Sequence, residues 1–189
     1  MRAVADECNI SVGNLNYYYR NKADLFEDLL ETVIAGYLAD FDVILTDSDS
    51  HSPEQSLERI IRFIIADIGT RETTVFFPEL WALANHDSRA SKRMHELYRK
   101  ARLVFDELIP RVNPTLSEAE VRQLSLFVSA SLEGHTMFIG HKKPWAKYRQ
   151  NLGNIAAKGL LDLVRSITPD DIRKGHLAQK KLNAKVSVG

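Results

Sequence analysis

The chain has 189 residues, of which 44% are apolar, and its 25 basic residues balance its 25 acidic ones. This balance excludes a polyelectrolyte that binds nucleic acid or membranes over its whole surface, so any affinity for DNA must come from a local patch. The single cysteine, Cys8, cannot form an internal disulfide, no signal peptide is evident and no apolar run reaches the roughly 18 residues of a membrane span, which predicts a soluble, cytoplasmic protein with no membrane partner.

Helices are predicted for almost the whole chain, because apolar residues recur at helical spacing and β-branched alternation is almost absent. The expected helices run over residues 1–6, 11–22, about 22–45, 53–68, 75–85, 91–109, 118–139 and 145–167. Capping residues mark several starts, namely Ser52 with Gln55, Ser117 with Glu120, and more weakly Asn21, Thr168 and Asp87 or Ser88. Pro110 is expected to end the helix before it.

The first two short helices have the outline of a helix-turn-helix. Asn9 stands in the turn, where a left-handed backbone is needed and asparagine is tolerated next best after glycine. Ile10 and Leu15 are expected to fill the angle between the helices. Residues 1–22 carry three basic and two acidic side chains, a net charge of +1, which is weak for a DNA footprint by itself. A helical hairpin that merely caps a bundle is the alternative interpretation.

The second short helix combines amides, phenols and basic residues that suit a DNA groove. Asparagine side chains can read adenine bidentately, while tyrosine, arginine and lysine suit phosphate oxygens. The helix that begins after Asn21 is expected to direct its first amide groups at the same DNA backbone. The segment SVGNLNYYYRNKADLFEDLL resembles the signature of tetracycline-repressor (TetR) regulators. The residues expected at DNA are Ser11, Gly13, Asn14, Asn16, Tyr17, Tyr18, Arg20 and Lys22.

The resemblance implies a transcriptional repressor that binds a double-stranded DNA operator as a homodimer and is released by a small-molecule effector. Two departures stand out: the turn glycine of the family is Asn9 here, and the family's first helix, expected before Met1, is missing. Without that helix, Val4, Ile10 and neighbouring residues would expose apolar surface. A ligand-binding helical dimer without DNA-binding activity is therefore the second hypothesis.

The last two long helices are expected to form the dimer interface, since small residues let helices approach closely between larger apolar ones. The residues expected there are Leu124, Val128, Ser131, Leu132, Ile155, Gly159, Leu160 and Leu163. Contacts within a single chain are the alternative for these residues.

Aromatic and polarisable residues of the middle helices are expected to line an effector pocket. They are Tyr37, Phe41, Phe76, Phe77, Trp81, Met94, Tyr98, Phe105, Phe127, Glu133 and Met137. Glu79, His86 and His135 are further polar candidates for its wall. Ordinary core packing is the alternative for each of them. The effector is expected to favour one tilt of the helix over residues 22–45, which changes the separation of two DNA-binding units.

The sequence is divided into a helix-turn-helix segment over residues 1–24, a ligand-binding and dimerisation bundle over 25–168 and a frayed carboxyl-terminal tail over 169–189. The six histidines include no i, i+4 pair and no HExxH motif, and neither a phosphate-binding glycine loop nor a GxSxG motif is present. No metal, no cofactor and no enzymatic activity are therefore expected. A small helical enzyme stays a third hypothesis, which predicts a convergent polar cluster in a cleft.

Overall fold

The computed structural model describes residues 1–46 and 52–173, and every regular element in these ranges is a helix, which confirms the all-α fold class. In chain order the elements are α1 (Arg2–Glu7), α2 (Val12–Tyr18), α3 (Lys22–Thr46), α4 (Pro53–Asp67), α5 (Arg71–Ala84), α6 (Ser88–Val112), α7 (Glu118–Glu133), α8 (Thr136–Ile139), the 3-10 helix η2 (Ala146–Tyr148) and α9 (Arg149–Ser166). We call α1 and α2 the head, and α3 to α9 the body.

Side-chain caps begin several helices where the sequence predicts them. At α4 the N–H of Gln55 donates to the Ser52 hydroxyl (3.3 Å), and the N–H of Ser52 donates to the Gln55 side chain (2.8 Å). At α6 the carboxylate of Asp87 accepts hydrogen bonds from the N–H groups of Arg89 and Ala90, at 2.8 and 2.9 Å. Such bonds satisfy amides that have no partner inside the helix, so they depend on local sequence alone.

Several expected helix boundaries are wrong. Pro110 does not end α6, which continues to Val112: proline loses one N–H donor, but its φ angle fits a helix and only two residues follow it. Helix α5 begins at Arg71, four residues before the expected start at residue 75. The hydroxyl of Thr70 caps it by accepting a hydrogen bond from the N–H of Thr73 (3.2 Å).

The expected helix over residues 118–139 is interrupted, since α7 ends at Glu133 and the short α8 follows. Directly after α8, Gly140 packs closely against α5. A Cβ atom at this position would lie 2.6 Å from the Thr74 hydroxyl and 2.6 Å from the carbonyl oxygen of Thr136, distances that no side chain tolerates. Glycine is therefore required where the chain turns against α5.

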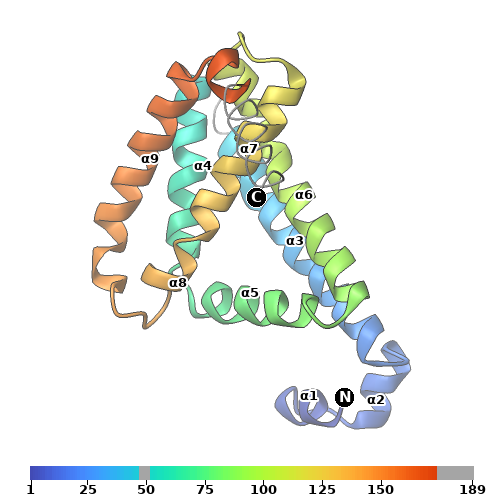
Figure 1. Ribbon diagram of the computed structural model, residues 1–189. Helices are drawn as coiled ribbons and strands as arrows, with labels where there is room; N and C mark the ends of the chain where they lie inside the picture. Colours follow the sequence, from blue (N-terminus) through green and yellow to red (C-terminus); the bar gives the residue numbers. More distant parts are fainter. Residues whose placement is uncertain (47–51, 174–189) are drawn as a thin grey trace, which may run out of the picture.

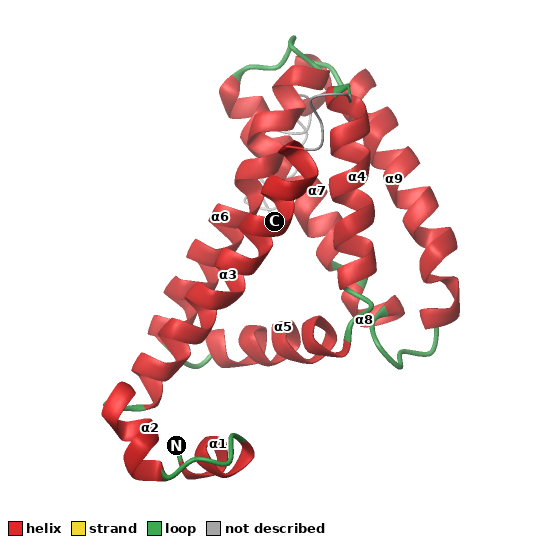
Figure 2. Cartoon of the chain, turned by 180° about the vertical axis from the view of Figure 1, so that it is seen from behind, coloured by secondary structure: helices red, strands yellow, loops and turns green. Residues whose placement is uncertain are grey.

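The body has the outline of a triangle when it is viewed across its helices (Figure 1). Helices α3 and α6 lie side by side along one edge, α4, α7 and α9 form the opposite edge, and α5 runs across the base. The reverse view shows the same arrangement, with α9 at the outer edge and the head at the far end of α3 (Figure 2). The head is thus joined to the body through α3.

Two apolar clusters hold the body together. The larger joins α4, α6, α7 and α9, and its fully buried side chains include Leu57, Ile60, Leu108 and Val128. The smaller joins α3, α5 and α6, and consists of Leu30, Ile34, Phe77, Leu80 and Leu97. Tyr37 packs against both clusters, so the centre of α3 lies where they meet.

The first five residues of the expected tail, 169–173, form a helical turn that packs against the body. Ile172 contacts the larger cluster, and the guanidinium of Arg173 lies 2.8 Å from the carboxylate of Glu120. These residues are therefore not frayed, contrary to expectation. The rest of the expected tail lies outside the described residues.

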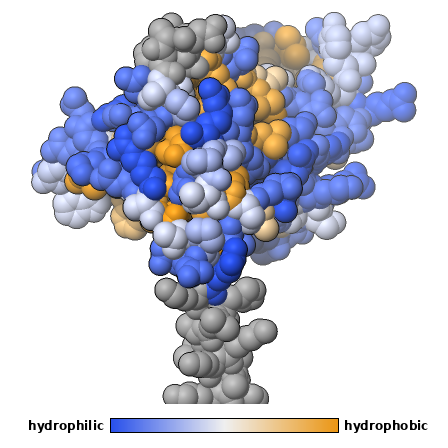
Figure 3. Space-filling view, turned by 90° about the horizontal axis from the view of Figure 1, so that it is seen from above, coloured by the Kyte–Doolittle hydropathy of each residue, from blue (hydrophilic) through white to orange (hydrophobic). Residues whose placement is uncertain are grey.

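Seen from above, the surface of the body is largely hydrophilic, with apolar residues in strips between polar ones (Figure 3). None of the described helices is both long and apolar enough to cross a membrane.

Candidate nucleic-acid interface and internal cavity

The turn between α1 and α2 has the geometry that its sequence predicts. Asn9 adopts a positive φ of 53°, the left-handed conformation that asparagine tolerates better than most residues. Ala5 and Leu15 are buried between the two helices. Ile10, expected to fill the same angle, is 37% exposed, and its backbone N–H donates to the carbonyl of Ala5 (3.0 Å).

All eight residues expected at DNA are exposed: six lie at or in α2, Arg20 lies in the turn after α2 and Lys22 begins α3. Tyr17 and Tyr18 are 84% and 70% exposed, and their rings meet edge to face. On the opposite side of α2, Leu15 is buried, so the helix has one inward and one outward face. The hydroxyl of Ser11 accepts a hydrogen bond from the N–H of Asn14 (3.0 Å), which fixes where this outward face begins.

Short-range contacts fix how α2 joins α3. The side chain of Asn21 accepts hydrogen bonds from the N–H groups of Ala23 and Asp24 at 2.8 and 3.0 Å. The hydroxyl of Tyr19, at the end of α2, donates to the carboxylate of Asp28 on α3. The first amides of α3 expected at the DNA backbone are therefore partly satisfied within the chain.

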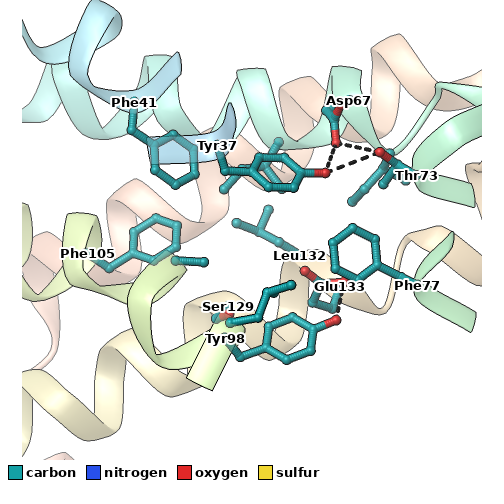
Figure 4. Close-up of a pocket in the computed structure, with 14 residues that line it drawn as sticks. Tyr37, Phe41, Asp67, Thr73, Phe77, Tyr98, Phe105, Ser129, Leu132 and Glu133 are labelled. Carbon is teal, nitrogen blue, oxygen red and sulfur yellow. Dashed lines mark hydrogen bonds between the residues drawn. The ribbon is translucent and has the colours of Figure 1, made fainter. Parts of the chain in front are cut away.

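An internal cavity of about 40 Å³ lies inside the triangle, where the two apolar clusters meet (Figure 4). Residues of five helices line it, and they are Tyr37, Phe41, Ile64, Asp67, Ile68, Thr73, Phe77, Leu97, Tyr98, Ala101, Phe105, Ser129, Leu132 and Glu133. The volume holds a few water molecules, well under the ~300 Å³ of a typical ligand pocket. A larger ligand would therefore have to displace side chains.

Two polar groups face this cavity from opposite sides (Figure 4). On one side the carboxylate of Asp67 accepts hydrogen bonds from the hydroxyls of Tyr37 (2.6 Å) and Thr73 (2.8 Å). On the other side the Tyr98 hydroxyl accepts from the indole N–H of Trp81 (2.7 Å) and lies 3.4 Å from the carboxyl of Glu133.

The carboxyl group of Glu133 is largely buried, and this burial raises its pKa to about 7. The hydrogen bond from Tyr98 opposes this shift, while the negative charge of Asp67 adds to it. Burial is also the main cause of the raised pKa values of the Tyr37 and Tyr98 hydroxyls. Glu133 therefore exchanges its proton near neutral pH.

Six of the eleven residues expected at an effector line the cavity, namely Tyr37, Phe41, Phe77, Tyr98, Phe105 and Glu133. Phe76, Trp81 and Met94 pack beside the smaller cluster instead. Phe127 and Met137 lie on the surface, 54% and 53% exposed, because they fall on the outward faces of α7 and α8. Of the other wall candidates, Glu79 and His86 are exposed, and His135 lies against the carbonyl of Ser131.

The sequence interpretation missed three polar residues of the cavity, Asp67, Thr73 and Ser129. Asp67 carried a usable signal, because it interrupts the apolar run RFIIADIG on a face that is otherwise buried. The sequence gives no such signal for Thr73, since this residue lies in a polar stretch that was interpreted as a loop. Ser129 was interpreted as one of several small residues that allow close helix packing.

The eight residues expected at a dimer interface fall into two groups. Leu124, Val128, Leu132 and Leu160 are at most 8% exposed and belong to the chain's own larger cluster. Those four side chains therefore pack within the chain. Ile155 is 66% exposed, and Gly159 has no atom within 4 Å of where a Cβ would stand. Ser131 and Leu163 are partly buried.

Within the described ranges, no three histidine, cysteine or acidic side chains are grouped so that they could hold a metal ion.

Comparison with protein families identifies the amino-terminal segment. Residues 1–29, which comprise the head and the first turns of α3, match the family described as bacterial regulatory proteins, tetR family. No curated protein matches the sequence. The matched segment contains the left-handed turn at Asn9, the exposed face of α2 and the capped start of α3. The amino-terminal segment of the chain is therefore similar to the DNA-binding segment of the tetR family of bacterial regulatory proteins.

Proposed function

We propose that the chain is a repressor that binds an operator as a homodimer and is released by a small molecule in the internal cavity. The observation that carries the proposal is the continuity of α3. This helix begins directly after the exposed recognition helix α2, and its middle residues Tyr37 and Phe41 line the cavity.

The outward face of α2 supports contacts with both bases and phosphates. Asn14 and Asn16 offer amides suited to base edges, and Tyr17 and Tyr18 offer phenol groups beside them. A Cβ at Gly13 would meet only the Ser11 hydroxyl at 3.8 Å, an ordinary contact. Nothing within the chain therefore requires glycine at position 13, which supports an external reason, the close approach of a DNA backbone.

A second copy is needed because one small head recognises too few base pairs to be selective. The outer face of α9 supports this association. Ile155 and Gly159 lie one turn apart on this face. The side chain of Ile155 is exposed, and no other part of the chain covers Gly159. Paired helices use such a combination, because an apolar side chain gives contact area and a glycine lets the helices approach closely. Phe127 on α7 adds a second exposed apolar side chain.

Movement of α3 would transmit a signal from the cavity to the head. Lys22 and Tyr37 are 15 residues apart, about 22 Å along a helix. Between them, the guanidinium of Arg93 on α6 lies 3.2 Å from the carboxylate of Glu27 on α3. A ligand that displaces the Tyr37 ring changes the packing of α3 on its neighbours, and a tilt about this region changes the separation of the two heads.

Selection of duplexes from a random DNA library, followed by anisotropy titrations, tests the proposal. We expect Asn16→Ala to weaken specific binding by roughly 1–3 kcal/mol without changing the salt dependence. Gly13→Ala is expected to weaken DNA binding while leaving the fold intact. Gly36→Ala is the matched control, since a Cβ at Gly36 meets nothing within 4 Å and this residue lies on α3 away from the head.

Two outcomes would contradict the proposal. If no duplex is enriched over non-specific binding, the chain would be a ligand-binding helical dimer that does not recognise DNA. If a duplex is enriched but both head variants bind it as the wild type does, the face of α2 is not the reading surface.

A further inference from the structure

The wall of the cavity contains two acidic residues and no basic one. Asp67 and Glu133 line it, whereas no lysine, arginine or histidine is among its lining residues. Five aromatic rings surround the same space, those of Tyr37, Phe41, Phe77, Tyr98 and Phe105. Aromatic faces attract cations, and a desolvated carboxylate attracts them more strongly still.

The two carboxyl groups differ in how well they are satisfied. Asp67 accepts hydrogen bonds from two hydroxyls, at 2.6 and 2.8 Å, so its charge is already stabilised within the chain. Glu133 has one long contact, 3.4 Å from the hydroxyl of Tyr98. That hydroxyl also accepts the indole N–H of Trp81, so the Trp81–Tyr98 pair holds it in place. Glu133 is therefore the carboxyl group that can still pair with a ligand.

We propose that the effector is an amphipathic organic cation, whose ammonium group pairs with Glu133 and whose apolar part packs among the aromatic rings of the cavity. This inference rests on the proposed function, in which the cavity is the effector site. An anion is disfavoured because both carboxyl groups would repel it. A neutral apolar ligand would leave the buried carboxyl of Glu133 without a partner, at a cost in affinity.

The size of the cavity indicates which side chains must move. Its 40 Å³ accommodates a small alkylammonium group but not an attached ring. Tyr98 closes one side and is held by Trp81 and Glu133. When an ammonium group pairs with the carboxyl of Glu133, the hydrogen bond between Tyr98 and Glu133 breaks. The Tyr98 ring can then rotate away from the cavity. Trp81 then loses its hydrogen-bond partner and reports binding.

The experiment uses probes matched in shape and different in charge. They are tetramethylammonium, benzyltrimethylammonium, its uncharged carbon isostere neopentylbenzene and the anion benzylsulfonate. Each is titrated into the full chain carrying Trp145→Phe, so that Trp81 is the only tryptophan and its emission reports the cavity. Trp145 is half exposed and does not line the cavity. Binding is measured in parallel by calorimetry.

We expect at least one of the two cations to bind, and to bind more tightly than the neutral isostere and the anion. Glu133→Gln should weaken binding of the cation by about 10- to 100-fold, because the variant loses a largely desolvated ion pair. The matched control, Glu79→Gln, changes an exposed glutamate of α5 outside the cavity and should leave affinity unchanged. Circular dichroism establishes that both variants are folded.

The pH profile supplies a second readout that a structural role of Glu133 would not give. The groups that face Glu133 are Tyr98 on α6, Asp67 on α4 and Tyr37 on α3. The pKa of Glu133 is raised to about 7, whereas burial raises the pKa values of the two tyrosine hydroxyls above their usual range. A quaternary cation does not titrate, so its affinity should rise about tenfold from pH 6 to pH 8 as Glu133 ionises. Glu133→Gln should abolish this rise.

Tighter binding of the neutral or anionic probe, a cation affinity unchanged in Glu133→Gln, or binding of no probe at millimolar concentration would each overturn the inference. A different outcome would separate the two proposals. If neopentylbenzene binds saturably, shifts the emission of Trp81 and releases the selected DNA, the proposed function stands and the proposal of a cationic effector is wrong. The DNA selection described above contains no ligand, so its result decides the DNA-binding part of the proposed function independently.

Discussion

Glu133 shows how one residue acquires unusual chemistry from its surroundings. On the sequence it is a glutamate inside the helix expected over residues 118–139, and the fold places its carboxyl group beside the cavity, opposite Asp67. Burial disfavours the charged form, and no basic side chain of the wall compensates for it. The chain thus keeps a destabilising acid at its centre, a cost that a binding site explains better than packing does.

This acid predicts a pH dependence of stability. The pKa of Glu133 is about 7 in the fold and near 4.5 in the unfolded chain, so its contribution is fully present below pH 4.5 and is lost as pH rises through 7. Relative to Glu133→Gln, we expect the wild type to lose roughly 2 kcal/mol of unfolding free energy between pH 5 and 8. Urea denaturation across this range measures it, and parallel curves for the two proteins would contradict the pKa assignment.

At the scale of elements, the position of α5 depends on a single buried hydroxyl. Thr74 donates to the carbonyl of Ile68 at 2.9 Å and accepts the N–H of His141 at 2.7 Å. It therefore joins α5 both to the end of α4 and to the turn after α8. Because Gly140 packs on the same hydroxyl, there is no room for a larger group here. These hydrogen bonds hold the base of the triangle together with the apolar packing of Phe77 and Leu80 in the smaller cluster.

Thr74→Val should therefore be costly although the side chains have similar shapes. The change leaves a buried carbonyl and a buried N–H without partners, which costs about 2–4 kcal/mol. The control is Thr32→Val on α3, where an exposed hydroxyl bonds only to the helix carbonyl of Asp28, and we expect a change of under about 0.5 kcal/mol. Equal loss of stability in both variants, measured by thermal unfolding, would show that Thr74 is not an anchor.

For the whole molecule, the arrangement separates two surfaces. The head lies at the far end of α3, and α9 lies at the outer edge of the body (Figures 1 and 2). A second copy that pairs through α9 leaves both heads free for DNA. The apolar side chains that could hold the pair are few, since Leu124, Val128, Leu132 and Leu160 are used within the chain.

Substitution of Ile155 by lysine tests this surface. Because Ile155 is 66% exposed on α9, the change costs a monomer little but places a charge in the proposed interface. We expect the wild type to sediment as a dimer and Ile155→Lys as a monomer. Val43→Lys, a substitution at a 69% exposed residue of α3, should stay dimeric. A monomeric wild type, or a dimeric Ile155→Lys, would exclude α9 as the interface.

The sequence was most informative where structure depends on neighbours along the chain. Ser52 and Asp87 begin helices through bonds to residues two or three positions away, and Asn9 turns the chain through its own backbone preference. The outward face of α2 follows from helical period alone.

Tertiary structure decided which residues meet. Leu124 and Phe127 are three residues apart, so helical spacing alone places them at neighbouring positions of α7. It does not say which of the two the rest of the chain covers, and the packing of α7 within the body buries Leu124 and leaves Phe127 exposed. Asp67 and Glu133 are 66 residues apart and share a cavity because the packing of five helices brings the ends of α4 and α7 to the same space. Contacts between distant elements depend on crossing geometry, which a one-dimensional pattern does not contain.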